Sequence, residues 1–147
     1  MDYWIQLFAQ HELLYVFLVC FFGATLLPLP TEAAILGALA LHESVIWVWV
    51  IGSIGNMLGA TTNYWLGAKF EGWTHNNLNK SKSGRKALAW FHQYGKYSML
   101  ASWMPIVGDP LCFSAGLFRL ERSWFVIGLF TRAVRYLVVI AGFRMLY

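Results

Sequence analysis

The chain has 147 residues, enough for a single domain, and carries a net charge of +4. Of its residues 59% are hydrophobic, 18% are aromatic and only 12% are charged, against roughly 25% charged residues in ordinary soluble domains. A soluble domain of this size could not bury so much apolar surface, so the composition excludes that class and predicts an all-α integral membrane protein.

The positive charge does not indicate a nucleic-acid partner. The cations lie in one polar segment and at the edges of apolar stretches, where they set orientation in a membrane. Cys20 and Cys112 are far apart in apolar stretches, without a CxxC motif or a His/Cys cluster, so we expect packing residues and no metal or cofactor. The first cation is Lys69, so the N-terminus lacks the charged region of a signal peptide.

Residues 2–10 are predicted to form a short amphipathic helix in the membrane interface. Five apolar stretches follow it: 13–27, 33–41, 45–66, 97–118 and 124–143. A helix needs about 20 residues to cross the hydrocarbon layer. Only 45–66 and 124–143 are uninterrupted over that length, so these two are predicted to span the membrane.

Two breaks interrupt the other apolar stretches. The first is Pro28-Leu-Pro30-Thr-Glu32, and the second runs from Pro105 to Pro110 and contains Gly108 and Asp109. Prolines and an acid cannot continue an apolar helix through hydrocarbon. We therefore predict that each break is the turn of a re-entrant hairpin, buried in protein. The alternative is that each break lies at an interface and joins ordinary helices, since residues 3–27 could span by themselves.

Cations predict the orientation. The segment 67–96 carries six of them against the single acid Glu71, which places it in the cytoplasm. The link 119–123 also carries two arginines and prefers the cytoplasm, so both ends of 97–118 lie on one side, as a re-entrant hairpin requires. Residues 1–12 and 42–44 contain acids but no Lys or Arg and suit the outer face.

The two breaks share the pattern Pro-x-x-x-acid, and each is followed by a glycine-containing apolar stretch and a full span. One crossing separates the hairpins, so the two halves are inverted in the membrane, an arrangement typical of transporters. We predict a single membrane domain, 1–147, with a first repeat at 1–66, a cytoplasmic polar loop at 67–96 and a second repeat at 97–147.

Four charged residues lie inside the apolar stretches or in the break between two of them. Glu32 and Asp109 are expected to face a cavity or a partner, because an acid in hydrocarbon is costly; the alternative is that both cap the helices that follow them. Arg132 and Arg135 are three residues apart in the last span and share a helix face. They require carboxylates or phosphates, which predicts either a phosphate clamp or a static ion pair.

Asn56 lies in the stretch Gly55-Asn-Met-Leu-Gly59, which fits close helix packing as well as a place in a cavity. No nucleophile with a base and an orienting acid can be assembled, and there is no phosphate-binding glycine loop or metal-ligand spacing. We therefore do not expect an enzyme.

These residues resemble the DedA family of bacterial inner-membrane proteins (the VTT, or SNARE-associated, domain), and most closely its small YqaA-like branch. The resemblance rests on LLPLPTEAAILGAL, IGNMLGATTNYWLG, YGKYSMLASWMPIVGDPLCFSAG and RAVRYLVV, which are residues 26–39, 54–67, 94–116 and 132–139. It implies two re-entrant hairpins that face each other, and proton- or ion-coupled movement or scrambling of phospholipids or of the undecaprenyl phosphate carrier.

Within the resemblance, Glu32 matches the acid of the first hairpin, Asn56 falls where many members have Asp, and Arg132 and Arg135 fall near essential arginines. The usual Pro-x-Pro-Gly-Glu reads Pro-Leu-Pro-Thr-Glu here, and the arginine of the second hairpin is replaced by Trp103 and Asp109. The expected partners are membrane lipids with phosphate headgroups, protons or cations, and a second copy of the chain. A small ion or solute transporter and a non-transporting scaffold are the alternatives.

Overall fold

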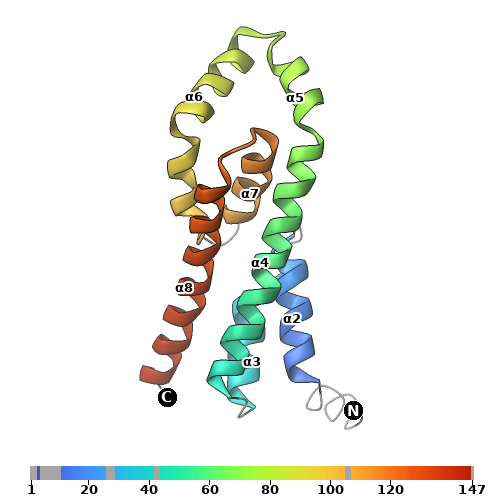
Figure 1. The fold of residues 1–147 in the computed structure, drawn as a ribbon. Helices are drawn as coiled ribbons and strands as arrows, with labels where there is room; N and C mark the ends of the chain where they lie inside the picture. Colours follow the sequence, from blue (N-terminus) through green and yellow to red (C-terminus); the bar gives the residue numbers. More distant parts are fainter. Residues whose placement is uncertain (1–2, 4–10, 26–28, 42–43, 105–106, 147) are drawn as a thin grey trace. The chain divides into compact units, whose positions relative to one another are not determined.

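The computed structural model describes residues 3, 11–25, 29–41, 44–104 and 107–146. Every regular element in these ranges is helical, which confirms the all-α prediction (Figure 1). The helices are α2 (Glu12–Gly23), α3 (Thr31–Ala40), α4 (Val45–Lys69), α5 (Glu71–Leu78), α6 (Lys82–Ser98), the 3-10 turn η1 (Met99–Ala101), α7 (Gly108–Leu117) and α8 (Arg122–Leu146). Pro28, Pro105 and the predicted interfacial helix, apart from Tyr3, lie outside the described residues.

Two helices in the described ranges are long and apolar enough to cross a membrane, α4 and α8. Each has 25 residues and is therefore about 37 Å long, compared with about 30 Å of hydrocarbon. They coincide with the predicted spans 45–66 and 124–143 and run two or three residues further at three of the four ends. The short helices α2 and α3 have 12 and 10 residues, or about 18 and 15 Å, and neither could cross alone.

The chain divides into two compact units. The first combines Met1–Gly59 with Ala133–Tyr147, and the second is Ala60–Arg132. Each unit therefore contains one of the two predicted breaks and a part of both long helices. The units do not follow the sequence repeats 1–66 and 97–147, because α8 contributes its second half to the first unit.

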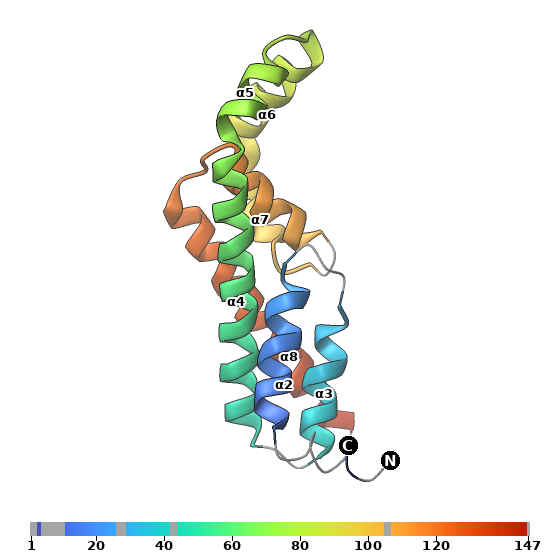
Figure 2. The same cartoon turned by 90° about the vertical axis from the view of Figure 1, so that its right-hand side faces the viewer.

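In the first unit, α2 and α3 lie side by side (Figure 2). The backbone of α2 passes close to α4 at two glycines of α4. A Cβ at Gly55 would lie 2.7 Å from the carbonyl oxygen of Phe17, and a Cβ at Gly59 would overlap the carbonyl oxygen of Phe21. This is the close packing that small residues four apart permit between membrane helices. The buried core joins α2, α3, α4 and α8 and consists of Val16, Cys20, Ile35, Ala38, Val48, Tyr136 and Ile140.

In the second unit, α7 packs on the end of α4 through a reciprocal pair of glycines. A Cβ at Gly116 would overlap the Tyr64 carbonyl, and a Cβ at Gly67 would overlap the Phe113 carbonyl. The backbones of α4 and α7 can approach this closely only because neither helix carries a side chain at the crossing. The buried core of this unit consists of Ala60, Met99, Cys112, Ala115 and Phe125.

The polar segment 67–96 is mostly helical, since it ends α4 and then forms α5 and most of α6. α5 and α6 make a helical hairpin (Figure 2). Ser81 is the N-cap of α6. Its hydroxyl accepts a hydrogen bond of 2.9 Å from the backbone N–H of Gly84, which satisfies one of the free donors of the first turn. α6 then continues through η1 towards the second break.

Candidate functional site

Both acids predicted to lie within the membrane occupy the second position of a ten-residue helix. Glu32 follows Thr31 at the start of α3, and Asp109 follows Gly108 at the start of α7. Pro30 lies at the N-cap of α3, and Pro110 lies in the first turn of α7, where a proline costs no hydrogen bond. Gly108, Asp109 and Pro110 are thus helical, although the sequence placed them in a break. A carboxylate at this position is stabilised by the helix dipole.

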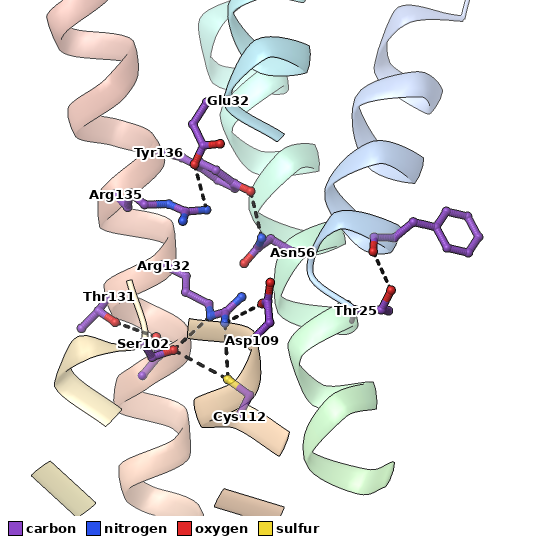
Figure 3. A network of polar contacts seen from close by, with 12 residues as sticks. Thr25, Glu32, Asn56, Ser102, Asp109, Cys112, Thr131, Arg132, Arg135 and Tyr136 are labelled. Carbon is purple, nitrogen blue, oxygen red and sulfur yellow. Dashed lines mark hydrogen bonds and ion pairs between the residues drawn. The ribbon is translucent and has the colours of Figure 1, made fainter. Parts of the chain in front are cut away.

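In the second unit, Asp109 pairs with Arg132 of α8 (Figure 3). The distance from Arg132 Nη2 to Asp109 Oδ1 is 2.9 Å, and the two side chains are 3% and 20% exposed. Arg132 also donates from Nε to the Ser102 hydroxyl at 3.0 Å and from Nη2 to the Cys112 sulfur at 3.5 Å. The guanidinium is therefore bound by groups from two consecutive parts of the chain, the turn after η1 and helix α7.

Ser102 and Cys112 complete this cluster, and their side-chain atoms lie 3.7 Å apart. The sequence predicts only a packing role for Cys112, and Ser102 belongs to no motif that marks it. Ser102 follows the 3-10 turn η1, so its direction depends on a backbone bend that residue spacing does not reveal. The signal that could identify Ser102 is a buried hydroxyl next to a buried guanidinium, and this is visible only in the three-dimensional structure.

In the first unit, Glu32 pairs with Arg135 more loosely (Figure 3). The distance from Arg135 Nη2 to Glu32 Oε1 is 3.4 Å, and the side chains are 12% and 35% exposed. Thr31 donates to the other carboxylate oxygen, Oε2, at 3.1 Å. The guanidinium carbon also lies 4.8 Å from the ring centre of Tyr136, within cation–π range.

Asn56 and Tyr136 form a buried hydrogen bond in the same unit, in which the Asn56 amide donates to the Tyr136 hydroxyl at 2.9 Å. Both side chains are almost completely buried. Asn56 therefore faces a residue of α8 next to Arg135, while its neighbouring glycines pack on α2. The interhelical hydrogen bond of Asn56 and the close glycine contacts both fit the close-packing interpretation of this stretch.

The predicted charged residues thus meet in two pairs, one in each unit, and each pair joins an acid at a helix start to an arginine of a spanning helix. Within the described ranges, no three His, Cys, Asp or Glu residues gather as metal ligands. Arginine with a carboxylate can exchange that carboxylate for a phosphate, because both offer paired oxygens to the planar guanidinium. The arrangement can therefore hold an anion or exchange a proton.

Comparison with known proteins identifies the family. Residues 6–144 match the VTT domain. The inner membrane protein YqaA of Escherichia coli is 39% identical over 132 residues, which are 86% of this chain and 87% of that protein. An uncharacterized protein of Haemophilus influenzae is 30% identical over 82% of this chain and 76% of its own length. One of Methanocaldococcus jannaschii is 26% identical over 97% and 90%.

No solved structure matches the chain significantly. The family match covers both breaks, all of α4, α8 up to Arg144 and all four charged residues of the candidate site. The chain belongs to the VTT domain family, which confirms the resemblance to DedA proteins read from its sequence.

Proposed function

We propose that the chain is a multi-pass inner-membrane transporter that moves phospholipid or a lipid-linked phosphate carrier between the leaflets, coupled to protons or another cation. The location follows the inner membrane protein YqaA, to which the chain is 39% identical. The proposal rests on one observation: each arginine in the middle of α8 is paired with an acid at the start of a helix too short to span.

Charge and length support a route for a polar headgroup. Two cations and two acids at membrane depth are costly in hydrocarbon and mark ion or substrate pathways. Backbone ends at that depth, such as those of α3 and α7, are tolerated where protein or water surrounds them. In this proposal α2–α3 and η1–α7 are re-entrant hairpins of an inverted repeat, and segment 67–96 is cytoplasmic.

The headgroup phosphate displaces a carboxylate from an arginine in this mechanism. Arg132 or Arg135 binds the phosphate, while Asp109 or Glu32 takes up a proton or a cation and so loses its charge. When the phosphate leaves, the carboxylate ionises and pairs with the arginine again. The site alternates between two neutralised states, which avoids an isolated charge in hydrocarbon.

Lipid flipping in proteoliposomes tests the proposal. Wild-type chain should move a labelled phospholipid across the bilayer, and Glu32→Gln together with Arg132→Ala should abolish the movement while the protein stays folded. Arg144→Gln is a control, because this exposed arginine lies near the end of α8, outside both ion pairs. Equal rates for wild type and the double variant would refute lipid translocation.

Two further outcomes distinguish the alternatives. Uptake of a small solute that depends on a pH gradient, without lipid movement, would replace lipid by a small substrate. Retained cellular function in Glu32→Gln and Asp109→Asn would instead identify a scaffold. The inverted repeat is tested separately with Glu32→Cys and Asp109→Cys, which should react with water-soluble thiol reagents from opposite sides. Reaction from one common side would refute it.

A further inference from the structure

α6 presents two faces of opposite character. Its buried face contains Gly84, Leu88, Phe91 and Gly95, and it packs inside the second unit, where Phe91 stacks on Phe118 at 4.4 Å. The other side, here called the outer face of α6, contains Lys82, Lys86, Trp90, Tyr94 and Tyr97, and all five are exposed. Lys86 is two positions from Gly84, which on an α-helix is about 200°, so Lys86 points away from the core.

The outer face has an order along the helix. Its first two turns carry Lys82 and Lys86, and neither makes an ion pair with any residue that the structure describes. From its middle to its end it carries Trp90, Tyr94 and Tyr97, and the rings of Trp90 and Tyr94 lie 5.9 Å apart. A helix that passes from the membrane interface into water has Trp and Tyr in the interface and lysines on the water side of them.

Neighbouring residues of the same unit repeat the combination at the aromatic end. Lys96 Nζ lies 5.1 Å from the ring centre of Tyr97 and 6.0 Å from that of Trp124. Tyr97 and Trp124 also contact each other edge to face at 5.8 Å. At the end of α4, Lys69 Nζ lies 4.0 Å above the ring of Trp65. Two helices of this unit, α4 and α6, thus each place a lysine over an aromatic ring.

We propose that the outer face of α6 binds the anionic phospholipid headgroups of the membrane in which the chain lies. Trp90, Tyr94 and Tyr97 enter the headgroup layer, and Lys82 and Lys86 pair with lipid phosphates. The site is separate from both ion pairs and does not depend on lipid translocation. Charge complementarity identifies the ligand, because segment 67–96 has six cations and only Glu71, which is paired with Arg119.

Tethering favours lipid over a soluble partner. α6 begins thirteen residues after Lys69, the last residue of the spanning helix α4. A surface connected through so short a segment meets the adjacent lipid headgroups at a high effective concentration. Anionic headgroups also attract lysines near the surface more strongly than neutral ones do. A nucleic acid would have to compete for the same cations from solution.

The test uses the full chain in nanodiscs with a fluorescent label on α6. Ser83→Cys puts the label on an exposed position between Lys82 and Lys86, and Cys20 and Cys112 are buried and leave that thiol as the accessible one. Increasing the phosphatidylglycerol fraction in phosphatidylcholine should move the label into a less polar environment. Lys86→Gln should raise the fraction required by about fivefold, and Lys86→Arg should leave it unchanged.

Arg144→Gln is the charge-matched control, because it removes one exposed cation from α8 and none from α6. It should leave the response to phosphatidylglycerol intact. A label that reads the same in both lipids would overturn the proposal, and so would an equal loss in Lys86→Gln and Arg144→Gln. A response to added RNA but not to phosphatidylglycerol would also overturn it and would assign the face to nucleic acid. Translocation rates do not enter any of these outcomes.

Discussion

The helices α3 and α7 have the same plan but different surroundings. Each has ten residues, has a proline at its N-cap or in its first turn, carries its acid in second position and pairs that acid with an arginine of α8. In α7 the pair is 2.9 Å long, and its arginine also contacts Ser102 and Cys112. In α3 the pair is 3.4 Å long, and the carboxylate is 35% exposed.

The packing of the two helices differs in the same way as their ion pairs, and it is tighter around α7. Gly116 of α7 faces the Tyr64 carbonyl so closely that a Cβ would overlap it, whereas a Cβ at Gly37 of α3 would meet nothing within 4 Å. One side of α3 instead borders a groove of about 430 Å³. The same sequence pattern is therefore held tightly in the second unit and more loosely in the first. We infer that the Glu32–Arg135 pair is the one that opens more easily.

The largest expected effect concerns the two arginines. Arg132→Ala should destabilise the protein by about 3–5 kcal/mol, because it leaves Asp109 without its partner inside a buried cluster. Arg135→Ala should cost about 1 kcal/mol, because Glu32 is accessible to water or headgroups once its partner is gone. Unfolding of each variant in mixed detergent micelles measures both values.

A double variant separates the ion pair from the cavity that truncation creates. Arg132→Ala combined with Asp109→Ala should be less destabilised than Arg132→Ala alone, because the uncompensated charge has been removed as well. Equal losses for Arg132→Ala and Arg135→Ala would contradict the difference between the two units.

The two glycines should respond with opposite signs. Gly116→Ala should destabilise the protein by about 1–3 kcal/mol, because its methyl group meets the backbone of α4. Gly37→Ala should stabilise it by up to about 1 kcal/mol, because alanine is the better helix former and the position is open. Thermal unfolding in detergent reports the sign of each change, and stabilisation by Gly116→Ala would disprove the close approach of α7 to α4.

The sequence predicted the parts of this fold that follow from hydropathy. The two long apolar helices needed only the length of the stretches 45–66 and 124–143. The cost of charge in hydrocarbon led us to expect partners for the four charged residues, and the structure pairs each of them. The identity of each acid's arginine did not follow, because Arg132 and Arg135 are three residues apart on one helix face and either could have served Glu32 or Asp109.

Other features depend on contacts that no spacing reveals. Tyr136 receives the hydrogen bond of Asn56, and Ser102 receives that of Arg132, although neither residue belongs to a recognisable motif. The helical hairpin in segment 67–96 was hidden by its polarity, since only Gly84, Leu88, Phe91 and Gly95 repeat at helical spacing within α6. The difference between Gly37 and Gly116 lies in what each one touches rather than in its neighbours in sequence.

The smallest expected effect distinguishes the ends of the two helices. α7 ends with Arg119 in the left-handed region, at φ 47°, and the N–H groups of Arg119 and Leu120 bond to the carbonyls of Gly116 and Ala115, an arrangement that favours glycine. Arg119→Gly relieves about 1 kcal/mol of backbone strain but loses an exposed ion pair with Glu71 of similar or smaller value, so stability should change by less than about 1 kcal/mol. Arg119→Val should be clearly destabilising, since a β-branched residue rarely adopts this conformation.

At the end of α3, Leu41 has φ −85°, so Leu41→Gly offers no such relief and should only cost stability. Thermal unfolding of the three variants side by side decides the point, and an Arg119→Gly variant as unstable as Arg119→Val would show that the ion pair, not the backbone, holds this end of α7.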